Sequence, residues 1–150
     1  MQPYLFPYNG YFQLINAVDK FVIYNDIAFI KQGWINRNYI LLNGSKHLFT
    51  IPVKSISSYT FISETIVSDK PHNWDYKLLN TFKQGYRKAP FYNEVFPLIE
   101  NVIIDAKDKI ISDKIRKSIE LIIKYLDINT IIVESSAINQ NKKLKKSGRK

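Results

Sequence analysis

The 150-residue chain contains no cysteine, two histidines and no run of about 18 apolar residues. The lack of cysteine excludes a disulfide framework and a thiolate metal site. The short apolar runs predict no membrane span. Because the first residues lack a basic segment followed by a long apolar one, we identify no signal peptide and expect a cytoplasmic protein.

The sequence also lacks the common signatures of nucleotide binding and nucleophilic catalysis. It has no P-loop, no G-x-G-x-x-G and no G-x-S-x-G motif. His47 and His72 lie far apart in the sequence and form no metal-ligand pattern. We therefore expect no metal site, and the residues identify no cofactor.

What is present indicates one globular domain with an uneven charge. The hydrophobic content is 45% and the formal net charge is +9. Residues 141–150 hold six basic side chains and no acidic one, whereas residues 1–104 hold ten basic and seven acidic ones. We expect a single domain over 1–140 and a basic, flexible tail at 141–150 that leads to a missing C-terminal segment. Such a tail is weak evidence for nucleic-acid binding, which we do not expect; a nucleic-acid binder acting through the tail is the alternative.

The hydrophobic patterns predict an α/β domain with a mostly parallel sheet, an inserted β-hairpin and a helical segment in the second half. A helix at 11–18 and an apolar strand at 20–24 resemble a β-α-β unit whose first strand would precede Gln2. Asn43-Gly44 between two apolar runs (38–42 and 47–53) favours a hairpin, since both turn residues accept positive φ. The alternating residues 61–67 predict a strand, with an irregular crossing as the alternative.

The second half is predicted to be helical until a final strand. Apolar stripes and helix-starting residues predict helices at 74–86, from Pro90 to about 103, and from Ser112 or Asp113 to about 125. β-Branched residues predict a strand at 129–134. Residues 135–139 would then form a loop at the carboxyl end of that strand, where α/β sheets bind ligands.

The first thirteen residues form the most distinctive candidate site. Prolines and aromatic rings surround Gly10, which is expected just before a helix. A glycine there lets backbone N–H groups approach an anion, which the helix N-terminus favours, and the rings would stack on a sugar or base. The alternative is that this loop only covers one end of the sheet. The candidate binding residues are Gln2, Tyr4, Tyr8, Asn9, Gly10, Tyr11 and Gln13.

A second candidate site lies in residues 31–38. An arginine fork suits a carboxylate or phosphate, a lysine adds a point charge, and Trp34 would stack on a ring. The alternative is a solvated loop with Trp34 in the core. The candidate binding residues are Lys31, Trp34, Asn36, Arg37 and Asn38.

A third candidate is the acidic end of the first predicted strand, Asn25-Asp26. A carboxylate at the carboxyl end of a strand binds a sugar hydroxyl or a metal, or acts as a base. Asp26 is therefore the candidate catalytic base. The alternative is that the two residues only form a turn.

Three of these stretches together resemble the WbqC-like family of bacterial proteins. They are residues 1–21, 33–38 and 48–53, which largely follow the family patterns Q-P-Y-F-x-P-Y-I-G-Y-F-Q-L-I, G-W-x-N-R-N and L-x-x-P-V. Residues 88–92 and 135–136 also fit, so the resemblance covers essentially the whole chain. The chain departs from the pattern at Asn9, where the family usually has isoleucine. Family members usually begin slightly earlier with a short strand and continue past position 150 with a helix and a Y-I-N-x-x-G-G loop, so the chain resembles a fragment.

The resemblance implies a transferase in the biosynthesis of bacterial surface polysaccharide, including the O-antigen of lipopolysaccharide. The implied reaction is transfer of glycine or another aminoacyl group to a sugar, and the implied partners are a nucleotide- or lipid-linked sugar and a small donor. A non-catalytic module that binds nucleotides or sugars in the same pathway is the alternative. The family motifs match at Gln2, Pro3, Tyr4, Pro7, Gly10, Tyr11, Gln13, Trp34, Asn36, Arg37 and Asn38.

Overall fold

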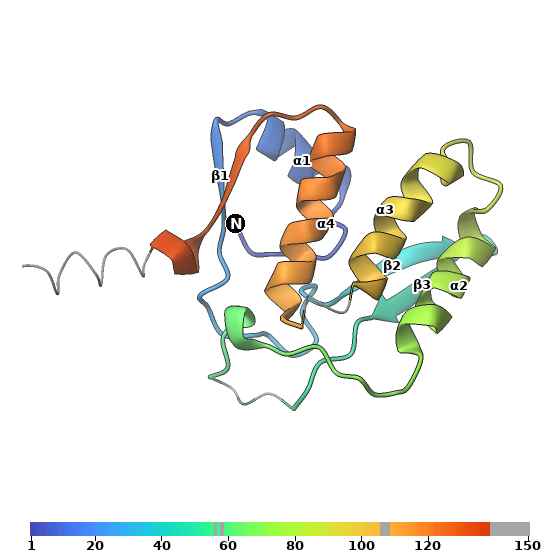
Figure 1. The fold of residues 1–150 in the computed structure, drawn as a ribbon, viewed down its shortest axis with the longest axis horizontal. Helices are drawn as coiled ribbons and strands as arrows, with labels where there is room; N and C mark the ends of the chain where they lie inside the picture. Colours follow the sequence, from blue (N-terminus) through green and yellow to red (C-terminus); the bar gives the residue numbers. More distant parts are fainter. Residues whose placement is uncertain (56, 58, 106–108, 139–150) are drawn as a thin grey trace, which may run out of the picture.

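A computed structural model describes residues 1–55, 57, 59–105 and 109–138 of the chain (Figure 1). The predicted tail at 141–150 lies outside these residues. Helices and strands are mixed along the chain, so the predicted α/β class is confirmed. The elements are α1 (Asn9–Asn16), β1 (Lys20–Ile23), β2 (Arg37–Leu42), β3 (Ser45–Thr50), the 3₁₀ turn η1 (Ile62–Glu64), α2 (Trp74–Tyr86), α3 (Tyr92–Ile104), α4 (Ile111–Tyr125) and β4 (Ile131–Glu134).

The first sheet is parallel and joins the two ends of the described chain. β1 pairs with β4, with Lys20 opposite Ile131 and Ile23 opposite Glu134. The N-terminal amine of Met1 donates to the Val22 carbonyl (2.6 Å), and Tyr24 N–H donates to the Met1 carbonyl (2.8 Å). Met1 therefore pairs with the edge of β1 that β4 leaves open, as expected for the β-α-β unit with α1 as its crossover.

The second sheet is the antiparallel hairpin of β2 and β3, which the Asn-Gly turn predicted. Asn43 and Gly44 have φ angles of 51° and 78°, the positive values that this turn requires. The hairpin packs on α2 at close range: Leu41 N–H donates to Tyr86 Oη (2.9 Å), and a Cβ at Gly85 would lie 2.9 Å from the Leu41 carbonyl oxygen. In the described residues the hairpin is a sheet of its own, separate from the parallel pair.

The strand predicted at 61–67 is wrong, and the alternative, an irregular crossing, is what forms. The segment makes η1 and single bridges, Val53 to Val67 and Ile66 to Ile110. Its polar side chains satisfy the backbone locally, since Thr65 Oγ1 donates to the Phe61 carbonyl (2.9 Å). Short polar side chains of this kind compete with the hydrogen-bond ladder of a strand.

The three predicted helices of the second half are confirmed with shifted ends. α3 begins two residues after Pro90 and contains Pro97, whereas α4 begins at Ile111 and buries Ser112 within its first turn. Lys114, only 3% exposed, joins the two helices. Its ammonium donates to the Val102 and Asp105 carbonyls (both 2.9 Å), so a cation caps the C-terminus of α3.

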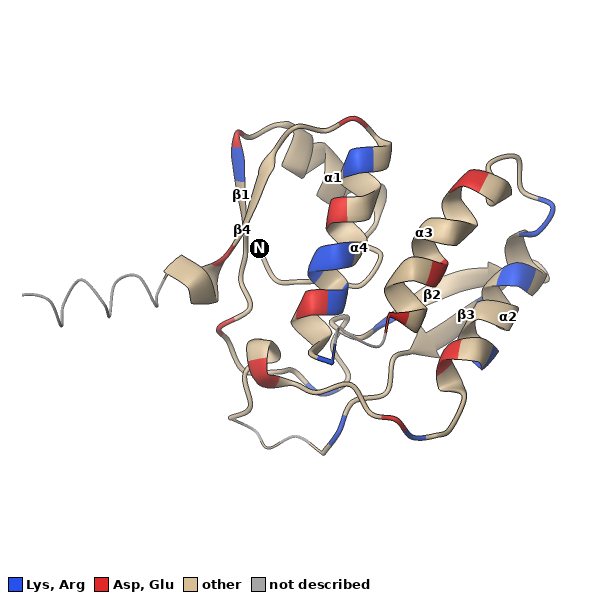
Figure 2. Ribbon diagram, viewed as in Figure 1, with Lys and Arg blue, Asp and Glu red and all other residues tan. Residues whose placement is uncertain are grey.

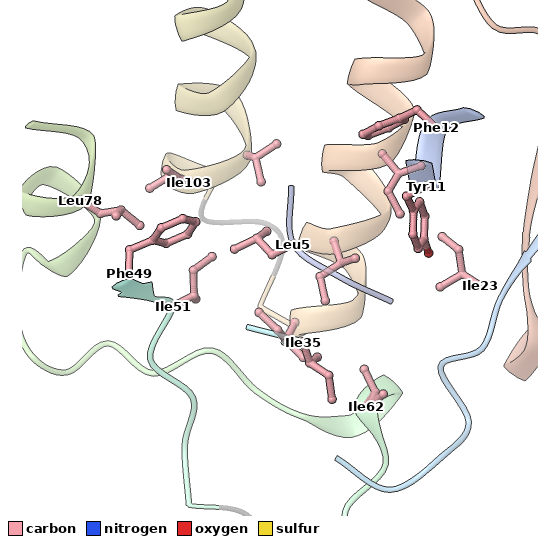
Figure 3. Packing of buried hydrophobic residues seen from close by; sticks show 14 of the residues in the cluster. Leu5, Tyr11, Phe12, Ile23, Ile35, Phe49, Ile51, Ile62, Leu78 and Ile103 are labelled. Carbon is pink, nitrogen blue, oxygen red and sulfur yellow. The ribbon is translucent and has the colours of Figure 1, made fainter. Parts of the chain in front are cut away.

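One continuous core unites the two sheets. Figure 3 shows Leu5, from the N-terminal loop, between side chains of the hairpin region and those around α1 and β1. Phe49 contacts Phe82 of α2 edge-on (5.2 Å between centroids), and Phe6 contacts the same ring (6.2 Å). The N-terminal loop thus packs between the two sheets and helps to position the residues discussed next.

Candidate functional site

Asn38 joins two of the three sequence stretches on which the family resemblance rests, 1–21 and 33–38. Its side-chain amide donates to the Leu5 and Phe6 carbonyls (3.1 and 2.8 Å). Phe6 has a φ of 46°, so these bonds hold the loop at a turn that non-glycine residues rarely adopt. The predicted binding residue Asn38 therefore clamps the N-terminal loop onto β2.

Tyr11, another predicted binding residue, has no exposed surface. Its hydroxyl donates to the Gln2 carbonyl (3.2 Å), and its ring contacts Phe21 at 5.3 Å and Tyr4 at 6.1 Å between centroids. Burial raises the pKa of the Tyr11 hydroxyl, which keeps it a neutral donor. The structure gives Tyr11 a packing role beneath the loop.

Gly10 lies inside α1, and the space beside it is filled by Tyr8. A Cβ at position 10 would overlap Cε2 of the Tyr8 ring, which is 68% exposed. A side chain at position 10 therefore fits only if the exposed Tyr8 ring moves, which accounts for a glycine there. Gln13 is an exposed residue of α1, and together with Asn9 it lines a cavity.

That cavity is an apolar groove of about 730 Å³ between α1, α3 and α4. Figure 2 shows acidic and basic segments interleaved along α4, whereas α3 carries acidic segments and no basic one. The groove shares no lining residue with the site around Lys31 and Arg37, so the structure separates Gln13 from those residues. Its apolar walls include Phe12, Val95, Leu98, Leu121, Ile122 and Tyr125.

The carboxyl ends of the parallel strands meet in a polar cluster, which we call the strand-end cluster (Asn25, Asp26, Glu134, Ser135 and Ser136). Ser135 Oγ accepts a hydrogen bond from Asn25 N–H (3.1 Å) and donates to the Asp26 carboxylate. The Asn25 side chain donates to Glu134 Oε1 (2.9 Å) and accepts from Ser136 N–H (3.1 Å). The loop predicted at 135–139 is wrong for residues 135–138, which form a helical turn directly after β4 (Figure 1), and position 139 lies outside the described residues. The first residues of that turn contact the predicted acidic pair, and Ser135 donates to the Asp26 carboxylate.

Glu134 is the member of the strand-end cluster whose ionised form is disfavoured by burial. Burial raises the pKa of its carboxyl, because desolvation outweighs the attraction of Arg116, whose Nη1 lies 3.4 Å from Glu134 Oε2. Arg116 is largely exposed and also pairs with Glu120 at 2.8 Å. The cluster is therefore closed by its own hydrogen bonds, with one carboxylate that burial makes costly to ionise.

A second polar site, which we call the basic hollow, is open. Lys31, Arg37 and Lys54 line a hollow of about 350 Å³ together with Thr50 and the buried Asn36. Within the part of the chain that the structure describes, no ion pair involves any of the three cations. The sequence supports this charge balance, since no acidic residue occurs between Asp26 and Glu64. Three uncompensated cations at one concave site favour an anionic ligand.

Arg37 lines the basic hollow, and Trp34 lies beside it through its contact with the Arg37 guanidinium. Arg37 Nε donates to the Gly33 carbonyl (2.9 Å), which places its guanidinium 5.6 Å from the centroid of the Trp34 ring. Trp34 is 45% exposed. The alternative in which Trp34 lies in the core is therefore wrong. Asn36 donates to the Ile51 carbonyl (2.7 Å) and fixes the loop against the residue that follows β3.

Two groups at this site escaped the sequence analysis. Thr50 is brought there because it pairs with Arg37 across the hairpin, which the turn position and register could have indicated. Lys54 lies four residues further, where the chain leaves the hairpin and bridges to the 61–67 segment through Lys54 N–H and the Ile66 carbonyl (2.8 Å). No local signal in the sequence predicts that crossing.

Fold and site together define an α/β domain whose hairpin presents cations and aromatic rings in the open. The chain belongs to the WbqC-like protein family, whose model matches residues 2–148. It is 28% identical over 130 residues to the uncharacterized protein Rv1507c of Mycobacterium tuberculosis (strain ATCC 25618 / H37Rv). That alignment covers 86% of this chain and 55% of the relative, so the chain spans about half the length of that protein. No solved structure gave a significant match.

The next two findings, on membrane-spanning helices and on metal ligands, apply to the described residues only. None of their helices has the length and apolar character needed to cross a membrane. Their histidine, aspartate and glutamate side chains form no group of three or more that would hold a metal ion.

Proposed function

We propose that the protein is a transferase that acts on a sugar linked through phosphate to a nucleotide or a lipid. The observation that carries the proposal is the basic hollow, where Lys31, Arg37 and Lys54 converge. Within the described residues, no carboxylate lines the hollow or forms an ion pair with these cations. Phosphate is the anion that such a set suits, because arginine binds it through a planar fork and lysine through a point charge. The half-exposed Trp34 ring beside Arg37 would stack on a ring of the phosphate-linked ligand.

The pathway and the group transferred rest on the family resemblance. The proposed pathway is the biosynthesis of bacterial surface polysaccharide, including O-antigen. The proposed reaction transfers glycine or another aminoacyl group to the sugar. Asp26 stays our candidate for the base that accepts the proton of the attacking sugar group, with Ser135 as its hydrogen-bond partner.

The test is calorimetric binding of sugar nucleotides, polyprenyl-phosphate sugars and pyrophosphate to the chain. Lys31→Ala and Lys54→Ala remove exposed ammonium groups and should each weaken the Kd about tenfold, which is about 1.4 kcal/mol. Arg37→Ala should weaken it further, since a bidentate contact is lost. Lys77→Ala, an exposed cation on α2, is the matched control and should change nothing. If all of these ligands bind the Lys31 and Lys54 variants as tightly as the wild type, the assignment of the hollow is wrong.

A second candidate, a non-catalytic module of the same pathway, is favoured by the closed strand-end cluster. There the Asp26 carboxylate already accepts a hydrogen bond from Ser135, and Asn25 is buried beside it. A module of this kind would bind the phosphate-linked sugar with the affinities described above and transfer nothing. Turnover of any sugar acceptor that is lost in Asp26→Asn, with ligand affinity unchanged, supports the transferase and excludes the module.

A further inference from the structure

The outer face of the hairpin carries large apolar side chains that nothing in the described chain covers. The register places Arg37 opposite Thr50, Tyr39 opposite Leu48 and Leu41 opposite Lys46, and these pairs point to one side of the sheet. We call this side, together with Trp34, the outer face. The inner face holds the buried Ile40 and Phe49. The exposed fractions on the outer face are 45% for Trp34, 48% for Tyr39, 57% for Leu41 and 42% for Leu48.

The two rings of the outer face contact each other and keep open surface. The centroids of Trp34 and Tyr39 lie 5.4 Å apart with the ring planes tilted by 54°, a favourable arrangement for an aromatic pair. Both rings remain about half exposed, so they offer a stacking surface for a planar group. A nucleobase on one aromatic ring contributes about 1–3 kcal/mol.

Cations accompany both rings. The Arg37 guanidinium lies 5.6 Å from the Trp34 centroid, and Lys46 Nζ lies 6.0 Å from that of Tyr39. Neither β2 nor β3 contains an acidic residue, and Figure 2 shows none on the hairpin. The outer face is therefore complementary to a ligand that is planar in one part and anionic in another.

The outer face and the basic hollow are continuous. Arg37 and Thr50 belong to both, and Tyr39 follows Arg37 by two residues on the same strand, about 7 Å along it. A flat ring on Tyr39 and Trp34 would thus lie next to a phosphate at Arg37. The large apolar groove, which would suit a lipid chain better, shares no lining residue with this surface.

We infer that the outer face binds a nucleoside diphosphate, with its base on Trp34 and Tyr39 and its diphosphate in the basic hollow. The inference rests on the proposed function and narrows it to a nucleotide-linked sugar. Charges alone do not account for such a preference, because pyrophosphate would satisfy Lys31, Arg37 and Lys54 equally well. The base must add affinity through the two rings.

The experiment compares the Kd of uridine and adenosine diphosphates with the Kd of pyrophosphate by calorimetry at one salt concentration. At least one nucleoside diphosphate should bind about tenfold more tightly than pyrophosphate. The double variant Trp34→Ala/Tyr39→Ala should lower that ratio to about one. The ratio compares two ligands on the same variant, so a change in phosphate affinity from the lost contact between Trp34 and Arg37 cancels. Trp34→Phe/Tyr39→Phe should keep most of the ratio. Tyr76→Ala, which removes an equally exposed ring on α2, is the control.

The outcomes separate this inference from the function on which it rests. If pyrophosphate or a polyprenyl-phosphate sugar binds through Lys31 and Lys54, and a nucleoside adds nothing, the inference is overturned and the function stands. If no phosphate ligand of any kind binds, both fail. A nucleotide preference that survives in the Trp34→Ala/Tyr39→Ala variant, with its fold verified by circular dichroism, also overturns the inference.

Discussion

The strand-end cluster and the basic hollow are both polar, and both lie where a connecting segment leaves a strand, yet only one is open. In the strand-end cluster, Ser135 and Asn25 bond to each other and to the neighbouring carboxylates, and both are buried. In the basic hollow, the cations meet no carboxylate of the described chain. In the strand-end cluster the polar groups bond to one another and join the end of β1 to the end of β4. In the basic hollow the polar groups remain open to a ligand. Changes in the first should therefore affect stability, and changes in the second should affect binding.

The largest effect is expected from Asn25→Ala in the strand-end cluster. The substitution removes the acceptor of Ser136 N–H and the donor to Glu134 Oε1, while Glu134 keeps its contact with Arg116. Buried groups that lose a partner cost about 1–3 kcal/mol each, so unfolding should become easier by roughly 2–4 kcal/mol in urea titrations. Asn80→Ala, exposed on α2, is the control and should stay within about 0.5 kcal/mol of the wild type. A similarly small effect of Asn25→Ala would show that the cluster does not hold the sheet.

A smaller loss is expected from Asn38→Ala on the inner side of the hairpin. The variant leaves the Leu5 and Phe6 carbonyls without their donor, at about 1–3 kcal/mol. The loop should also open more often, which hydrogen exchange would detect as faster exchange at Tyr8 to Tyr11. Unchanged exchange there would mean that packing of Leu5 alone holds the loop.

The variant Glu134→Gln tests the strand-end cluster through the pH dependence of its stability. Because burial raises the pKa of this carboxyl in the fold, the folded state binds more protons than the unfolded one between the ordinary pKa and the raised one. Wild-type stability should fall as the pH rises through that window and be free of this penalty below it. Glutamine keeps an oxygen for the Asn25 amide and does not ionise, so its stability relative to the wild type should grow from pH 4 to pH 7. The reverse trend in denaturation midpoints would mean that Arg116, not burial, dominates.

The smallest effect on stability is expected in the basic hollow. The double variant Lys31→Ala/Lys54→Ala removes two exposed ammonium groups that make no ion pair with the described residues, so the free energy of unfolding should change by less than about 0.5 kcal/mol. Relief of repulsion among three cations should if anything stabilise the variant, most visibly at low salt. A loss above 1 kcal/mol would place these lysines in the structural framework and remove the contrast between the two regions.

The sequence predicted the elements whose signal is local. Asn43-Gly44 specifies the hairpin, and the apolar stripes specify the helices, because turn residues and periodicity act within a few positions. The strand expected at 61–67 failed because Thr65 satisfies the backbone from its own side chain. Alternating residues cannot reveal whether a partner strand is present.

The candidate site was predicted in part. Lys31, Trp34 and Arg37 were identified because their chemistry is unusual for one short loop, and the structure brings them together. Tyr11 and Asn38 were grouped with them, although one is buried and the other clamps the loop, because a polar-tipped side chain has the same identity in the core and at the surface. Tyr39 and Lys54 join the site through register and a long-range bridge, which a single sequence does not specify.

The measurement that tests the central claim most directly is an amide and indole chemical-shift titration of the ¹⁵N-labelled chain with pyrophosphate and with uridine diphosphate. The account predicts shifts at Gly33, the Trp34 indole, Arg37 and Thr50 for both ligands, extended to Tyr39 and Leu48 by the nucleoside. It predicts no shift at Asn25, Ser135 and Ser136. Shifts concentrated at those three residues, with the hairpin unaffected, would contradict it.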